Sequence, residues 1–171
     1  MALSNWGMSY KGLANNKKGE WWLMAQILLI LLHLIPAWPA FPYLEFKLLI
    51  LLFGVSILAI GMFLSFRSLY SLGSNLSPLA YPKKGANLVT DGAYKYCRHP
   101  LYQAIIVCSL GVLIAKASLI HFLLLVLLGI TLRGKAKKEE QELQKIYSEY
   151  SKYISTTPAI IKGLSYLDWR N

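Results

Sequence analysis

The side chains best suited to chemistry fall in two short segments of the chain. The first is Arg98-His99-Pro100, and the second is the neighbouring pair Glu139 and Glu140. Proline is favoured at the first position of a helix, so Pro100 predicts a helix start, with free backbone N–H groups and a positive dipole end beside the Arg98 guanidinium. Such a corner is suited to binding an anion at the membrane surface. The alternative is that Arg98 only anchors the helix among lipid phosphates.

The glutamate pair favours a functional site at this corner. From Ala136 onward, apolar or aromatic residues recur with helical spacing at Leu143, Ile146, Tyr147, Tyr150 and Ile154. At about 100° per residue, Glu139 and Glu140 project within roughly 60° of Leu143, on the apolar face of one continuous helix. Buried carboxylates without partners are costly, so we expect this pair to meet Arg98, His99 or the loop backbone.

These segments must be positioned by membrane helices. Of the 171 residues, 56% are hydrophobic and 15% are charged, with a mean hydropathy of +0.44, which is too apolar for an ordinary soluble domain. A bilayer core requires about 20 apolar residues per helix. Two uncharged runs approach this length, Leu48–Phe66 and Trp21–Ile35, and two shorter ones follow, Leu101–Ala115 and Ala117–Leu132. Only Lys116 separates the last two, which predicts a helical hairpin. Gly54 and Gly61, one heptad apart, predict close helix contact.

The distribution of basic residues predicts the topology. Lys and Arg residues collect in the N-terminal tail, in the segment between the second and third runs and in the C-terminal tail, whereas Lys47 and Lys116 alone fall on the other side. Cytoplasmic flanks are rich in Lys and Arg, so we expect both termini and the central loop in the cytosol. The net charge of +10 then indicates an anionic membrane surface as partner, and no nucleic acid.

The expected fold is therefore an all-α, polytopic, multi-pass integral membrane protein with about four transmembrane helices in a single domain, 1–171. Its parts are a cytosolic tail (1–20), the first two spans (21–66), a cytosolic loop (67–100), a helical hairpin (101–132) and a cytosolic helix and tail (133–171). Cys97 and Cys108 lie in different parts, so we expect packing roles and neither a disulfide framework nor a metal site. The sequence does not indicate an oligomeric state.

Three further polar residues are interpreted as structural. His33 and His121 stand alone in apolar runs, where a packed or interfacial histidine is commoner than a ligand. Glu142 points away from the apolar face and is expected to pair in solvent with Lys138 or Lys145.

Beyond these patterns, the chain resembles the integral-membrane methyltransferases that include isoprenylcysteine carboxyl methyltransferase and phospholipid methyltransferase. The resemblance covers approximately Leu72–Ile161. It rests on the motifs Leu72-Gly73-Ser74-Asn75-Leu76-Ser77-Pro78, Leu88-Val89-Thr90-Asp91-Gly92-Ala93-Tyr94, Arg98-His99-Pro100-Leu101-Tyr102 and Glu139-Glu140-Gln141-Glu142-Leu143, with Tyr150, Tyr153 and Thr157-Pro158 downstream.

The resemblance implies that S-adenosylmethionine binds in a cytosolic pocket formed by the central loop and the C-terminal helix. The residues that it places at this cofactor are Leu88, Val89, Thr90, Tyr94, His99, Pro100, Leu101, Tyr102, Glu139 and Glu140. It further implies catalytic roles for Arg98 and Glu139, and substrate binding by Arg98 and Lys135. Lys135 stands where the family often has an arginine; lysine keeps the charge but lacks the bidentate fork.

The implied activity is methyl transfer to a lipidic or prenylated acceptor at the membrane interface, most like isoprenylcysteine carboxyl O-methylation. N- or S-methylation of a phospholipid or another small lipophile is the alternative. A sterol-reductase-like oxidoreductase is disfavoured because such enzymes usually have more spans. A non-enzymatic membrane subunit is also disfavoured, because the free-energy cost of the inward-facing Glu139 and Glu140 would then have no explanation. No strand followed by a glycine-rich turn and a helix is apparent, which disfavours a soluble-type methyltransferase.

Overall fold

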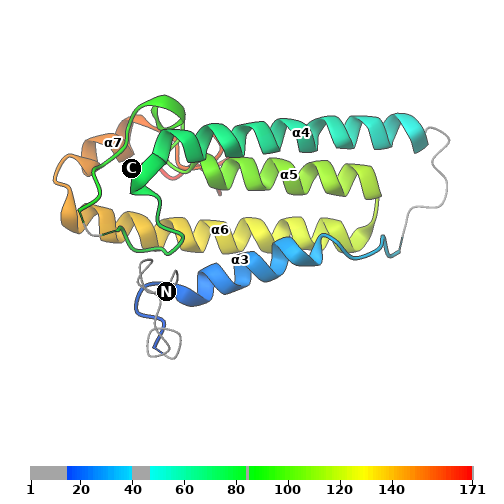
Figure 1. Cartoon of the computed structure of the whole chain (residues 1–171), viewed down its shortest axis with the longest axis horizontal. Coiled ribbons are helices and arrows are strands. Elements are labelled where there is room, and N and C mark those ends of the chain that lie inside the picture. The colour runs from blue at the N-terminus through cyan, green and yellow to red at the C-terminus, as the bar shows by residue number, and fades with distance from the viewer. Residues whose placement is uncertain (1–14, 40–46, 84, 171) are drawn as a thin grey trace.

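The computed structural model describes residues 15–39, 47–83 and 85–170, and all regular structure within them is helical (Figure 1). The long helices are α3 (Glu20–Leu32), α4 (Lys47–Leu72), α5 (Pro100–Lys116) and α6 (Leu119–Ile146). The short elements are η1 (Gly73–Asn75), η2 (Gly92–Lys95) and α7 (Tyr150–Thr156). The all-α prediction is thus confirmed for the described part of the chain.

Glycines allow α4 and α5 to pack closely along most of their length (Figure 1). A Cβ atom added to Gly61 would lie 2.6 Å from the Sγ atom of Cys108, and one added to Gly111 would lie 2.5 Å from the backbone N of Leu58. Gly54 lies equally close to α5. The close contact predicted for Gly54 and Gly61 is confirmed, and its cause is the absence of side chains at the points of nearest approach.

The predicted hairpin is formed by α5 and α6. α5 ends at Lys116, and the next residue, Ala117, has left-handed backbone angles (φ 43°) and donates its N–H to the carbonyl of Leu113 at 2.8 Å. Ser118 is extended and precedes the first turn of α6. The chain therefore reverses direction within two residues, which sets α6 alongside α5.

Two helical segments are long and apolar enough to cross a bilayer, namely Lys47–Asn75 and Leu119–Ile146. Much of α4 is exposed, including Leu48 (66%) and Phe63 (65%), as lipid-facing side chains would be. Helices α3 and α5 are apolar but have 13 and 17 residues. At 1.5 Å per residue they measure about 20 and 26 Å, less than a hydrocarbon core of about 30 Å. The count of four spans stays a prediction.

α6 extends beyond its apolar part, as the sequence predicts, but it ends at Ile146. Tyr147 adopts an extended conformation (φ −119°, ψ 111°), and α7 begins as a separate helix at Tyr150. The prediction of one continuous helix through Ile154 is therefore wrong. The hydroxyl of Tyr147 donates a hydrogen bond to the carbonyl of Ala86 in the preceding loop, and this contact holds the chain out of the helical path.

The buried core joins the helical hairpin to the C-terminal segment. Its residues are Tyr102, Ile106, Leu128, Leu132, Ala136, Ala159, Ile160 and Leu167. The last three follow α7, and the segment that contains them folds back because the N–H of Ile160 bonds to the carbonyl of Leu167 at 2.9 Å. The C-terminal segment thus packs where the start of α5 meets α6.

The isolated histidines lie at the opposite end of the bundle and are packed, as predicted. Both are buried; His33 Nε2 lies 2.6 Å from Ser109 Oγ, and His121 Nδ1 lies 2.6 Å from Ser118 Oγ. Lys116 Nζ donates to the carbonyl of His33 at 2.9 Å, so it satisfies an acceptor at the end of α3.

The packing of α4 on α5 can be tested with two alanine substitutions. We expect Gly111→Ala to lower the free energy of unfolding by about 1–3 kcal/mol, because the new methyl group would overlap the backbone of α4. Gly129→Ala is the matched control, since nothing lies within 4 Å of its Cβ position. It should be neutral, or stabilising by up to about 1 kcal/mol. Thermal unfolding in detergent measures both, and equal midpoints would contradict the close packing.

Candidate functional site

The candidate site lies where the start of α5 meets the end of α6. His99 precedes the first residue of α5, Pro100. The backbone N–H groups of Arg98 and His99 donate to the carbonyls of Pro158 and Ala159, each at 2.9 Å. These two donors therefore hold the C-terminal segment, whereas the anion site expected at the first-turn N–H groups of α5 stays a prediction.

Glu140 occupies the corner with its own carboxylate. Its Oε1 atom accepts a hydrogen bond from Arg98 Nε at 2.7 Å and lies 2.9 Å from His99 Nε2. Its Oε2 atom accepts one from Trp169 Nε1 at 2.6 Å. Glu140 is buried, and a buried carboxylate is tolerated when its oxygens are paired in this way. The predicted meeting of a glutamate with the arginine-histidine corner is present.

Arg98 is directed entirely into the protein. Besides its bond to Glu140, its Nη1 atom donates to the carbonyls of Ile154, at 2.8 Å, and Thr157, and its Nη2 atom donates to the carbonyl of Trp169 at 3.2 Å. The side chain is 0% exposed. Both sequence interpretations assumed an exposed cation at the membrane surface, and that assumption is wrong because the C-terminal segment covers Arg98. The catalytic and substrate-binding roles of Arg98 stay predictions.

Glu139 is the accessible member of the pair. Its Oε2 atom accepts a hydrogen bond from the Tyr102 hydroxyl at 2.8 Å and lies 3.8 Å from His99 Nδ1, while its side chain is 29% exposed. The rings of His99 and Tyr102 are stacked, with centroids 5.2 Å apart. Tyr102 and His99 therefore hold a carboxylate that solvent or a ligand can still reach.

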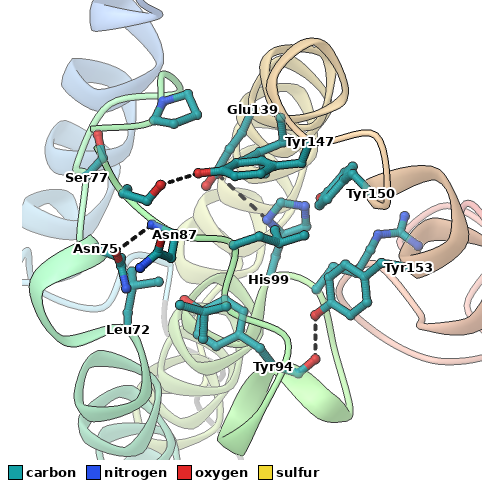
Figure 2. Close-up of a pocket in the computed structure, with 16 residues that line it drawn as sticks. Leu72, Asn75, Ser77, Asn87, Tyr94, His99, Glu139, Tyr147, Tyr150 and Tyr153 are labelled. Atoms are coloured by element: carbon teal, nitrogen blue, oxygen red, sulfur yellow. Dashed lines mark hydrogen bonds and ion pairs between the residues drawn. The ribbon is translucent and has the colours of Figure 1, made fainter. Parts of the chain in front are cut away.

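An open pocket lies in front of Glu139 (Figure 2). Its walls come from the loop before η2, from the end of α6 and from α7. The lining residues are Leu72, Asn75, Ser77, Pro82, Ala86, Asn87, Leu88, Val89, Tyr94, Arg98, His99, Glu139, Leu143, Tyr147, Tyr150 and Tyr153. We call this space the glutamate pocket. Of the ten residues predicted at the cofactor, it brings together Leu88, Val89, Tyr94, His99 and Glu139.

The other predicted residues lie outside the lining of the glutamate pocket. They are Thr90, Pro100, Leu101, Tyr102 and Glu140 from the cofactor set, and Lys135 from the substrate set. Tyr102 and Glu140 hold residues of the lining. Lys135 is buried, its Nζ atom lies 2.7 Å from Gln26 Oε1, and it sits 5.3 Å from the centre of the Tyr102 ring. The lysine is thus engaged by α3, and substrate binding by Lys135 stays a prediction.

Several lining residues were not singled out by the sequence. Asn75 and Ser77 belong to the Leu72–Pro78 motif of the family resemblance, from which no role of an individual side chain was predicted. Tyr147 and Tyr150 were read as apolar positions of a helical stripe, although they line the glutamate pocket (Figure 2). Trp169 was missed altogether, because the segment after α7 has no periodic pattern that would place it against Glu140.

The tyrosines of the glutamate pocket differ in how their hydroxyls are used. Tyr153 donates to the carbonyl of Tyr94, whereas the buried Tyr150 hydroxyl has no hydrogen-bond partner among the described residues. Burial raises the pKa of Tyr94, Tyr150 and Tyr153 well above the ordinary tyrosine value, and the nearby Glu139 or Glu140 carboxylate adds to the increase. All three rings are therefore neutral at physiological pH.

Cys97 is a packing residue next to the site, in agreement with the prediction. Its Sγ atom lies 3.1 Å from the carbonyl of Ala159, and burial raises the pKa of the thiol to about 12. The thiol is therefore neutral and not nucleophilic. Within the described residues, no group of three or more His, Cys, Asp and Glu side chains is arranged to hold a metal ion.

The arrangement suits a ligand that carries a positive charge. One accessible carboxylate and several neutral aromatic rings line the same pocket, and both kinds of group attract a cation. The amides of Asn75 and Asn87, together with the Ser77 hydroxyl, form an uncharged polar wall on the opposite side (Figure 2).

Comparison with known proteins gives two similarities. A family model described as phospholipid methyltransferase matches residues 49–150. The cobalt-zinc-cadmium resistance protein CzcN of Cupriavidus metallidurans is 31% identical over 84 residues, which are 48% of this chain and 39% of that protein. The chain thus spans less than half the length of this curated relative. No solved structure gives a significant match.

The hydrogen bond from Trp169 to Glu140 can be tested by a change of a few atoms. We expect Trp169→Phe to lower the free energy of unfolding by about 1.5–3 kcal/mol, because it removes a donor to a buried carboxylate. Trp38→Phe is the matched control, since Trp38 is 73% exposed. Thermal unfolding in detergent provides the measurement. The importance of the bond is refuted if the two variants unfold at the same temperature.

Proposed function

The chain belongs to the phospholipid methyltransferase family, and on that premise we propose that it transfers a methyl group from S-adenosylmethionine to a lipidic acceptor at the membrane interface. The observation that carries this proposal is the combination of the accessible Glu139 carboxylate with four tyrosine rings in one pocket. The pocket adjoins helices that are apolar enough to cross a bilayer. A cationic methyl donor would therefore reach it from water, and an apolar acceptor from the lipid.

The residues present fit S-adenosylmethionine, whose sulfonium group is a cation. Glu139 would balance that charge, and the rings of Tyr94, Tyr147 and Tyr150 would offer aromatic faces to it. The buried Tyr150 hydroxyl, which has no partner among the described residues, is free to bond a polar group of the cofactor. This unpaired group supports the view that a ligand completes the pocket.

The bound cofactor would supply an already activated methyl group, so the protein's task is to position the reactants and exclude water. We assign Glu139 to cofactor binding and catalysis. Arg98 and Glu140 act through their neighbours: their ion pair at 2.7 Å holds the corner that presents His99 to the glutamate pocket. Tyr102 holds Glu139 through the hydrogen bond of 2.8 Å.

The two cationic side chains predicted to bind the methyl acceptor are already engaged by other protein groups, which favours an acceptor without a carboxylate. Arg98 is paired with Glu140, and Lys135 is bonded to Gln26. We therefore propose an amine or another uncharged nucleophile on a lipid, in preference to the isoprenylcysteine carboxylate that the sequence favoured. An amine must lose a proton, and Glu139 and His99, 3.8 Å apart, are the acceptors that the lining offers.

We also propose that the end of the bundle with the glutamate pocket faces the cytosol and that α3 and α5 complete four spans. The start of α3, the loop between α4 and α5 and the C-terminal segment lie together at this end (Figure 1). Together with the end of α6 and with α7, these parts carry most of the Lys and Arg residues, as cytoplasmic segments do.

The role of Glu139 can be tested by comparing two ligands that differ in charge. Glu139→Gln retains an acceptor for the Tyr102 hydroxyl but removes the negative charge. We expect the affinity for S-adenosylmethionine to fall about tenfold, and that for the neutral S-adenosylhomocysteine to fall less, because only the former carries a sulfonium. Isothermal titration calorimetry measures both.

Glu142→Gln is the matched control, because Glu142 lies on the same helix and pairs with Lys145 at 2.8 Å. Its affinity for both ligands should equal that of the wild type. If Glu139→Gln binds S-adenosylmethionine as tightly as this control does, the proposed cofactor site is wrong.

The acceptor can be identified by label transfer. Purified protein in lipid is incubated with methyl-labelled S-adenosylmethionine and phosphatidylethanolamine, prenylcysteine or a native lipid extract, and the product is treated with alkali. We expect label in the lipid fraction that alkali does not release as a volatile product, because the bond of an N-methyl group resists alkali. Release of volatile methanol would identify a carboxyl ester and refute the amine proposal. Absence of label in every lipid would refute methyl transfer itself.

A further inference from the structure

A second pocket lies beside the segment that leads into α5. Its lining residues are Leu64, Arg67, Ser68, Ala93, Tyr96, Cys97, Pro100 and Gln103. We call it the interface pocket. Cys97 and Pro100 line this pocket, whereas Arg98 and His99 line the glutamate pocket. One stretch of backbone therefore separates the two.

The two pockets differ in their charged groups. Arg67 is the one charged residue in the lining of the interface pocket, whereas the glutamate pocket is lined by the accessible carboxylate of Glu139 and by Arg98, whose guanidinium is paired with Glu140. The guanidinium of Arg67 lies 6.0 Å from the centre of the Tyr96 ring, and the described residues provide no carboxylate within ion-pair distance of it. An unpaired guanidinium beside the neutral amide of Gln103 favours an oxyanion.

The position of Arg67 places the interface pocket at the depth of lipid headgroups. Arg67 is the first charged residue after the uncharged run Leu48–Phe66 of α4. Phe66, one position earlier, is 69% exposed, and Tyr70 and Tyr96 are 81% and 66% exposed. Arginine and exposed aromatic residues at the end of an apolar helix are typical of the zone where lipid meets water. An oxyanion available at this depth is a lipid phosphate.

We propose that the interface pocket binds the phosphate of an anionic phospholipid, held as a resident lipid and not as the methyl acceptor. Arg67 pairs with the phosphate oxygens, and the Gln103 amide donates a further hydrogen bond. The lining contains no carboxylate that would pair with the ammonium group of a zwitterionic lipid. The backbone from Cys97 to Pro100 separates the bound lipid from Glu139. Such a lipid would join the end of α4 to the start of α5.

Lipid binding to the full chain in detergent tests this proposal without any methyl donor. The probes are short-chain phosphatidylglycerol, phosphatidylcholine and diacylglycerol of the same chain length, together with inorganic phosphate, and native mass spectrometry reports the bound fraction. We expect saturable binding of phosphatidylglycerol, weaker binding of phosphatidylcholine, and neither binding of diacylglycerol nor competition by inorganic phosphate.

Variants then assign the site. Arg67→Gln should lower the affinity for phosphatidylglycerol about tenfold, because a charge-assisted pair is lost. Arg67→Lys, which keeps the charge but not the fork, should be intermediate, and Gln103→Leu should weaken binding. Lys47→Gln is the matched control, since it removes a charge from the other end of α4. Arg67 is exposed, so its variants should unfold at the wild-type temperature without lipid.

Three results would overturn the proposal. Equal affinity of wild type and Arg67→Gln would place the lipid elsewhere. Equal binding of diacylglycerol or phosphatidylcholine would mean that the pocket does not select an anionic phosphate. Displacement of phosphatidylglycerol by inorganic phosphate would mean that the pocket binds free phosphate and not a lipid. None of these results bears on methyl transfer, which the labelling experiment tests separately.

Discussion

The buried carboxylate of Glu140 is the group on which the rest of the site depends. It lies on α6 and joins that helix to two segments that are distant in sequence, because Arg98, His99 and Trp169 form hydrogen bonds with its two oxygens. A buried charge is stable only while its partners are in place, so the cost of losing any partner ties α6, the start of α5 and the C-terminal segment to one another. The chain after α7, which has little regular structure, is thereby made part of the core.

This network allows two adjacent glutamates to have different tasks. Glu140 is saturated by the protein, whereas Glu139, about 100° further round the helix, faces open space with one contact from Tyr102 and a longer one from His99. A rigid group placed behind an accessible one is how proteins hold a ligand-binding side chain in a fixed orientation. The same backbone segment that completes the network also separates the glutamate pocket from the interface pocket.

The membrane-facing part of the protein supports this site with few polar contacts. α4 and α5 are joined by glycines at their closest approach, and the polar contacts of His33, His121 and Lys116 are confined to the end remote from the pockets. Association of apolar helices in lipid depends on such close packing, because hydrophobic burial offers little gain there. The site end of the bundle can therefore be polar while the helices remain compatible with a bilayer.

The sequence by itself determined the helical class, the hairpin around Lys116, the glycine contacts of α4 and the approach of a glutamate to the Arg98-His99 corner. The first three features follow from hydropathy and helical periodicity, which act between residues close in the chain. The fourth follows from the cost of burying an unpaired carboxylate, which the place of the glutamates on the apolar face predicts. Only the tertiary structure decided that Arg98 is covered, that Lys135 turns to Gln26 and that α6 ends at Ile146. Each depends on a partner far away in sequence, such as Trp169 for Arg98 or Ala86 for Tyr147, and no local pattern encodes such a partner.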